Sequence, residues 1–226
     1  MRETFEKELR RLQDELLELG SRVENALIES SEVLRRRDEE GARRLVADDY
    51  LLNERRFAIE SAALVLIATQ QPMAGDLRSI AAILEIATEL ERIGDYGKGI
   101  ARISLMIGDV PLLKPLVDIP QMGRLARDML HQALDAFVRR DVGLARSIPK
   151  HDAEVDRLYD QVYRDLLGHI VANPENIDRA THLLWVAHNL ERAADRVTNI
   201  CERVVFTVTG EMVELNDHEA ASDAAG

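Results

Sequence analysis

Two pairs of acidic residues stand one helical turn apart in this 226-residue chain. Glu91 precedes Asp95 by four residues, and Glu191 precedes Asp195 in the same way. Residues four apart on a helix project from one face, about 40° apart around the axis. Each pair therefore forms a short acidic patch on one face of its predicted helix.

A second pair of oxygen-bearing side chains precedes each acidic pair. Asp49 and Asn53 lie upstream of the first, and Asp152 and Asp156 lie upstream of the second, at the same spacing. If the helices that carry them pack antiparallel, four such side chains face one another in each half. Carboxylates brought so close cannot all stay ionised unless a proton or a cation joins them. A hard or borderline cation such as iron, manganese, magnesium or zinc suits such a site.

The second half of the chain is the better candidate for a metal site. Its last predicted helix carries a continuous polar stripe, formed by His188, Glu191, Asp195, Asn199 and Glu202. The corresponding helix of the first half has Thr88 before its acidic pair and Gly99 after it. The alternative for either half is a solvated acidic face, whose neighbouring arginine simply pairs with an adjacent helix.

Patterns typical of catalysis are scarce. The chain has no Gly-rich phosphate loop, no His-Glu-x-x-His motif and no Glu-x-x-His pair of the ferritin-like di-iron bundles. Asp128-x-x-His131 comes nearest to such a pair, and it stands alone. We therefore predict a protein without catalytic activity. The alternatives are a carboxylate-bridged metal-dependent hydrolase or oxidase, and a purely structural helical scaffold.

The composition restricts the class of protein. Against 29 Lys and Arg stand 41 Asp and Glu, and the net charge of −12 disfavours binding to nucleic acid or anionic lipid. The single cysteine, Cys201, excludes an internal disulfide, and we expect it and Trp185 to be core residues. The longest apolar run, 62–68, is short of the roughly 18 residues that span a bilayer. Since the first residues also lack a signal-peptide core, we expect a soluble, cytoplasmic protein.

Helix-forming residues and the positions of proline predict an all-α fold. Leu, Ala, Glu and Arg dominate, and there is no Asn-Gly or Asp-Gly turn between alternating runs. We predict six long helices over about 5–36, 39–70, 75–107, 121–140, 141–171 and 174–209. Pro149 either kinks the fifth helix or marks a later start capped by Ser147. Asn173 followed by Pro174 is a good helix start.

The two halves of the chain resemble each other. Arg-Arg-Asp at 36–38 recurs at 139–141, and Leu-Glu-Arg at 90–92 recurs at 190–192. Two matches at nearly one offset indicate a duplicated unit of three helices. With short connections, neighbouring helices run antiparallel. We therefore predict an elongated molecule of two tandem three-helix bundles, over 1–110 and 118–211, with a disordered acidic tail over 212–226.

The acidic pairs and their neighbours resemble the signature of a known family. The first copy reads Glu-Leu-Glu-Arg-Ile-Gly-Asp over 89–95, and the second reads Asn-Leu-Glu-Arg-Ala-Ala-Asp over 189–195. With Gln71-Pro72 and Arg140-Asp141 as flanking matches, the chain is similar over about 5–210 to the PhoU family of phosphate transport system regulatory proteins. The second copy departs from the family's usual Ile-Gly, with Ala193-Ala194 in its place.

The resemblance implies two similar three-helix bundles, often dimeric, that bind metal clusters through Glu/Asp-x-x-x-Asp motifs. The ligands that it implies are Asp49, Asn53, Glu91 and Asp95 in one bundle, and Asp152, Asp156, Glu191, Asp195 and Asn199 in the other. It also implies a negative regulator of phosphate uptake and of the phosphate-starvation response. Such an adaptor links the ATPase of the phosphate ABC transporter to a phosphate-sensing histidine kinase, so that it meets the membrane only through its partners.

Overall fold

The computed structural model describes residues 2–215, and three long helices form the first half of this part of the chain. They are α1 (Arg2–Arg36), α2 (Glu39–Gln70) and α3 (Ala74–Ile107). Leu16, Leu19 and Leu27 lie along one face of α1 and are fully buried. A single apolar face on a long helix must pack against neighbours, and α1, α2 and α3 all contact one another. The first predicted bundle is therefore present.

The second half repeats this plan with more interruptions. Its helices are α4 (Asp118–Arg139), α5 (Val142–Ser147), α6 (Asp152–Ala172) and α7 (Ile177–Thr209). Short 3₁₀ turns at Ile148–His151 and Pro174–Asn176 precede α6 and α7. The long helices α4, α6 and α7 contact one another and form the second bundle. The predicted all-α fold of two bundles and six long helices is confirmed.

Pro149 divides the predicted fifth helix. Proline has no backbone N–H and disturbs the α-helical hydrogen-bond pattern before it, so the chain passes through a 3₁₀ turn between α5 and α6. The predicted cap at Ser147 is wrong, because its hydroxyl donates back to the Leu144 carbonyl at 2.7 Å. As a result α6 begins at Asp152, one of the predicted site residues.

The repeated Arg-Arg-Asp motif folds into the same turn in both halves. Arg37 and Arg140 take left-handed φ values of 57° and 54°, and each ends a helix. Asp38 and Asp141 follow and cap the next helix, each accepting a hydrogen bond from the backbone N–H three residues on, at 2.8 and 2.9 Å. The sequence repeat is therefore a structural repeat.

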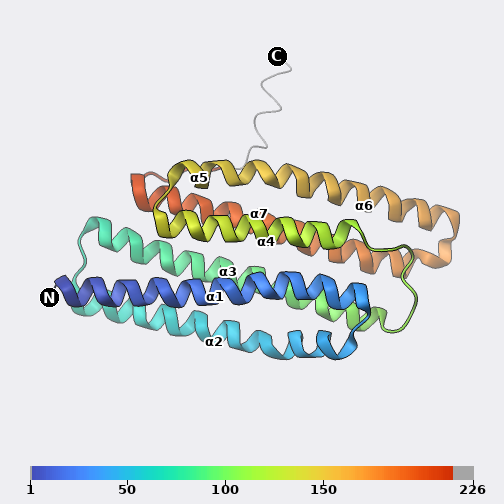
Figure 1. Cartoon of the computed structure of the whole chain (residues 1–226), viewed down its shortest axis with the longest axis horizontal. Coiled ribbons are helices and arrows are strands. Elements are labelled where there is room, and N and C mark those ends of the chain that lie inside the picture. Colours follow the sequence, from blue (N-terminus) through green and yellow to red (C-terminus); the bar gives the residue numbers. More distant parts are fainter. Residues whose placement is uncertain (1, 216–226) are drawn as a thin grey trace, which may run out of the picture.

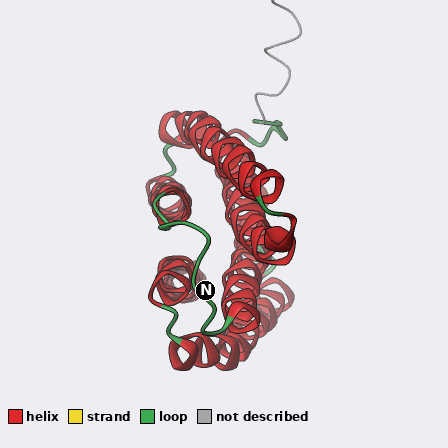
Figure 2. Ribbon diagram, turned by 90° about the vertical axis from the view of Figure 1, so that its right-hand side faces the viewer, coloured by secondary structure: helices red, strands yellow, loops and turns green. Residues whose placement is uncertain are grey.

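The two bundles lie side by side along their long axes, which gives an elongated molecule (Figure 1). Between the bundles, α1 contacts α4 and α3 contacts α7. Figure 2, turned by 90°, shows the helices of one bundle stacked against those of the other. One hydrophobic core runs through both bundles.

Equivalent residues of the two copies meet at the contact between α1 and α4. A Cβ atom at Gly20 would lie 2.3 Å from Leu134 Cδ1, and one at Gly123 would lie 3.2 Å from Ser31 Oγ. Gly20 and Gly123 are repeat partners, as are Ser31 and Leu134. The two copies thus pack through matching surfaces, as the subunits of a twofold dimer do.

Two predictions about single core residues had different outcomes. Cys201 is fully buried, as expected, and burial raises the pKa of its thiol to about 12. Trp185 is half exposed, so its assignment to the core is wrong. Its ring packs against His182 with the two centroids 5.8 Å apart. The neighbours Leu183, Val186 and Ala187 take the core positions of this part of α7.

The chain after α7 continues along the second bundle. The Leu215 backbone N–H donates to Glu202 Oε1 at 3.0 Å, and Val213 packs on the core. The prediction of a disordered tail is therefore wrong for residues 212–215, which pack on the second bundle, and residues 216–226 lie outside the described residues. In the part of the chain that is described, no helix combines the length and the apolar character needed to cross a membrane.

Candidate functional site

Helices α6 and α7 bring the second set of predicted residues together. Asp152 and Asp156 lie in the first two turns of α6, and Glu191 and Asp195 lie near the middle of α7. Burial, and then the negative charges of Asp195, Asp156 and Asp152, raise the pKa of Glu191 to about 7. The four carboxylates are therefore close enough to act on one another. We call this group the second acidic face.

Arg192 and His188 of α7 lie beside the second acidic face. Arg192 donates from Nη1 to Asp195 Oδ2 at 3.1 Å. His188 Nδ1 lies 3.3 Å from Glu191 Oε2, and the ring of Tyr159 lies beside His188 at 6.2 Å between centroids. Burial and the charge of Glu191 raise the pKa of the Tyr159 phenol. Burial and the neighbouring carboxylates together favour a proton on Glu191 near neutral pH.

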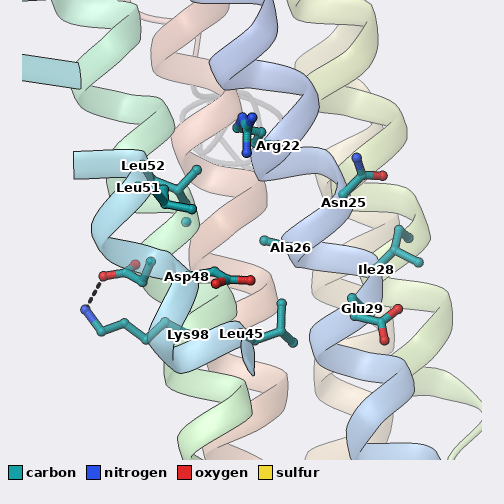
Figure 3. Close-up of a pocket in the computed structure, with 12 residues that line it drawn as sticks. Arg22, Asn25, Ala26, Ile28, Glu29, Leu45, Asp48, Leu51, Leu52 and Lys98 are labelled. Carbon is teal, nitrogen blue, oxygen red and sulfur yellow. Dashed lines mark hydrogen bonds and ion pairs between the residues drawn. The ribbon is translucent and has the colours of Figure 1, made fainter. Parts of the chain in front are cut away.

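The first set of predicted residues lies on α2 and α3, and a lysine joins it. Lys98 Nζ lies 2.5 Å from Asp49 Oδ2, the contact that a dashed line marks in Figure 3. It also lies 3.3 Å from Asp95 Oδ1. The hydrogen bond to Asp49 is the main cause that raises the pKa of Lys98. Asn53 also turns toward Asp49, with Nδ2 3.4 Å from its carbonyl oxygen. We call Asp49, Asn53, Glu91 and Asp95 the first acidic face.

Glu91 shares this first face with a second cation. Burial and the negative charge of Asp95 raise the pKa of Glu91, and the guanidinium of Arg56 opposes this rise. Asp49 adds a smaller negative contribution. Thus Glu91, Asp49 and Asp95 do lie on a common face, as the helical spacing predicts, with cationic groups from both helices beside them.

Asn199 is engaged elsewhere, at the contact between the two bundles. It donates from Nδ2 to Glu89 Oε2 at 3.2 Å. Glu89 is 8% exposed and also receives Arg92 at 2.6 Å and Arg196 at 3.4 Å. This network ties α3 to α7 and lines a polar groove of about 420 Å³ between them.

A groove of about 480 Å³ opens beside the first acidic face, between α1 and α2 (Figure 3). Arg22 and Asn25 line it from α1, and Asp48 lines it from α2. Gly94 of α3 forms part of its floor, where a Cβ atom would come within 2.6 Å of Leu52 Cδ1. The repeat partner of Gly94 is Ala194, which is fully buried, so the second copy accommodates a Cβ atom at this position.

The side chains of residues 2–215 do not form a group of three or more His, Cys, Asp or Glu residues already arranged to hold a metal ion. The predicted residues share two faces without converging on one point. Their assignment as metal ligands therefore stays a prediction.

Comparison with known proteins identifies the family. A model of the PhoU domain matches the chain twice, over residues 16–104 and 119–204. The chain belongs to the PhoU family. The two matched segments fall within the first and the second bundle, and they contain the two Leu-Glu-Arg motifs.

PhoU relatives match the chain from end to end. The phosphate-specific transport system accessory protein PhoU homolog of Clostridium acetobutylicum is 35% identical over 96% of this chain and 99% of its own. The homolog of Streptococcus pneumoniae is 34% identical over 96% of this chain and 100% of its own.

Solved PhoU structures share the fold. The crystal structure of the phosphate transport system regulatory protein PhoU from Streptococcus pneumoniae has a TM-score of 0.85 and 33% identity, over 92% of this chain and 99% of that one. PhoU from Pseudomonas aeruginosa has a TM-score of 0.86 and 31% identity, over 92% of this chain and 100% of that one.

Sequence reasoning missed two residues that supply positive charge to the first acidic face of this PhoU fold. Lys98 lies three residues after Asp95 and seven after Glu91, so helical spacing already placed it on the same side of α3. Arg56 stands seven residues after Asp49 and shares its side of α2 in the same way. Both could have been found by tracking cations as well as oxygen ligands.

Proposed function

We propose that this chain is a regulatory adaptor of the phosphate transport system. The observation that carries the proposal is the match through both bundles to relatives named as phosphate-specific transport system accessory proteins. A match to one bundle would support only a shared module, whereas an end-to-end match supports a shared task. The adaptor acts as a negative regulator of phosphate uptake and of the phosphate-starvation response, and it has no catalytic step of its own.

In this proposal the adaptor has two protein partners and functions as a homodimer. It links the ATPase subunit of the phosphate ABC transporter to a phosphate-sensing histidine kinase, on the cytoplasmic side of the membrane. Direct binding to anionic lipid is disfavoured by the net charge of −12. The outer surface of α2 supports a role in protein binding, because Tyr50, Phe57 and Leu64 stand exposed at seven-residue intervals. Such apolar rows are typical of surfaces that bind other proteins.

We also propose that the second acidic face binds a metal ion. Asp152, Asp156, Glu191 and Asp195 would hold it, and iron, zinc, manganese and magnesium all accept carboxylate oxygens. The chemistry of the donors supports the proposal, because burial and the repulsion of the neighbouring carboxylates raise the pKa of Glu191 to about 7, and a divalent cation would relieve that repulsion. We leave Asn199 out of this set because its amide is bound to Glu89.

The regulatory role is tested in a strain that lacks the gene, together with every other gene for a PhoU-domain protein. We expect a phosphate-starvation reporter to be expressed in phosphate-rich medium, and a plasmid copy of this chain to restore repression. A reporter that stays repressed in the deletion strain would contradict the proposal. An inactive copy with both Leu-Glu-Arg segments deleted controls for plasmid effects.

The metal is tested on purified full-length protein. We expect metal measured after native purification to fall when Glu191 and Asp195 are replaced by Gln and Asn. D160N is the matched control, because Asp160 lies on α6 with its side chain 68% exposed and paired with Arg164. Equal metal content in all three proteins would remove the assigned site.

A further inference from the structure

The two acidic faces differ in their cations when the repeat is aligned position by position. The carboxylates correspond closely, since Glu91 and Asp95 match Glu191 and Asp195. The positive charges do not correspond. The residue that matches Lys98 is Thr198, and the residue that matches Arg56 is Tyr159.

Lys98 stands between the two helices of the first face. Its Nζ lies 2.5 Å from Asp49 Oδ2 on α2 and 3.3 Å from Asp95 Oδ1 on α3. The Asp49 side chain is only 8% exposed and that of Lys98 is 21% exposed, so this contact is largely shielded from water. Metal–oxygen distances for hard cations are about 2.0–2.6 Å. A metal ion bridging these two oxygens would need the space that the ammonium group already fills.

The second face has no ammonium group at the matching position. Thr198 is a short, neutral side chain, 1% exposed. Tyr159 is also neutral at physiological pH. Neither of the two positions that carry Arg56 and Lys98 in the first copy therefore carries a cation in the second.

We propose that Lys98 is the resident cation of the first acidic face and replaces a metal ion there, so that metal binding is confined to the second face. The first-face residues therefore do not fit the ligand role that the family resemblance implies for them. Lys98 instead links α3 to α2 through Asp49, while its contact with Asp95 lies within α3. The part of this inference that assigns metal binding to the second face rests on the metal proposed above.

The test measures Mn²⁺ binding by metal-stripped full-length protein at pH 7.5, using equilibrium dialysis and the electron paramagnetic resonance signal of free Mn²⁺. First-face binding is isolated in the E191Q/D195N background. We expect that background to bind no Mn²⁺. Adding K98T, which copies the second face, or K98M, which keeps the volume without the charge, should raise first-face affinity by at least about 100-fold.

Further variants separate this inference from the proposed function. Adding D49N to K98T in the same background should abolish the gained Mn²⁺. Thermal melts with and without Mn²⁺ show whether each variant folds, and the K98T protein should gain stability from the ion. Mn²⁺ bound by the E191Q/D195N protein and lost on D49N would overturn the inference, as would no gain in either K98T or K98M. If the wild type binds no Mn²⁺ but K98T does, the second-face metal is refuted and the role of Lys98 stands.

Discussion

Replacing Glu191 by Gln in metal-free protein should abolish a pH-dependent loss of stability. In the folded chain the pKa of Glu191 rises from 4.5 to about 7, chiefly through burial and then through Asp195 and Asp156. The folded state therefore binds this proton more tightly than the unfolded state. This tighter proton binding stabilises the folded state fully below about pH 4.5, and the stabilisation is lost as the pH rises through 7.

The size of the effect follows from the same values. Each tenfold change in proton affinity corresponds to about 1.4 kcal/mol, so the rise in pKa corresponds to roughly 3 kcal/mol above pH 7. The Glu191 side chain is 22% exposed, and solvent screening reduces the expected value to about 2 kcal/mol. We expect E191Q to be about 2 kcal/mol more stable than the wild type at pH 8, and nearly equal to it at pH 4.5. For a chain of this size that is a rise in melting temperature of about 4–8 °C.

The assay is thermal and urea unfolding in EDTA from pH 4.5 to 8.5, for the wild type, E191Q and D160N. Asp160 is well exposed, so D160N should keep the wild-type pH dependence. The reasoning is refuted if E191Q retains the full wild-type slope between pH 5 and 7, since Glu191 would then not be the group that titrates. The same holds if D160N removes the slope.

Three further predictions concern packing. G20V should destabilise the protein by about 2 kcal/mol in urea unfolding, because the new side chain would collide with buried Leu134 at the contact between the bundles; stability equal to wild type would contradict that contact. G168A should stabilise it by about 0.5–1 kcal/mol, because Gly168 lies within α6 with open space around it; a loss of stability would show a contact there. Cys201 should react with a thiol reagent at pH 8 only after unfolding, because it is buried and its pKa is about 12; reaction of the folded protein would show that the core opens.

The helices could be predicted well because local features mark their ends. Asp38 and Asp141 cap helices in the structure as their types suggest, and the paired arginines before them end helices in both halves. Pro149 showed where the fifth helix would be disturbed, and of the two alternatives the structure has the later start, with a 3₁₀ turn at Ile148–His151 before α6. The exposure of Trp185 follows from the rotation of α7 in the bundle, which periodicity defines only to within a residue.

Helical spacing was enough to predict which acidic residues share a face of one helix. Spacing places Glu191 with Asp195, and the antiparallel pairing places them near α6, which the raised pKa of Glu191 reflects. Helical spacing does not show which neighbouring helix a polar side chain such as that of Asn199 will contact. Asn199 reaches across to Glu89 on α3, a contact set by how the bundles pack together.

The difference between the faces has a consequence for how the two bundles respond to their surroundings. Lys98 and Asp49 both belong to the chain, so their ion pair does not depend on the concentration of any ion in solution. Its burial also limits screening by salt. At the second face, burial and the neighbouring carboxylates raise the pKa of Glu191 to about 7, so its charge changes near neutral pH. Changes in pH between 6 and 8, or in metal supply, should therefore alter the second bundle more than the first. Amide hydrogen exchange, measured in EDTA at pH 6 and pH 8, tests this difference. From pH 6 to pH 8, exchange in α6 and α7 should become faster than the known pH dependence of the unprotected amide explains. Exchange in α2 and α3 should change only by that pH dependence. Equal additional exchange in both bundles would mean that Lys98 does not insulate the first face.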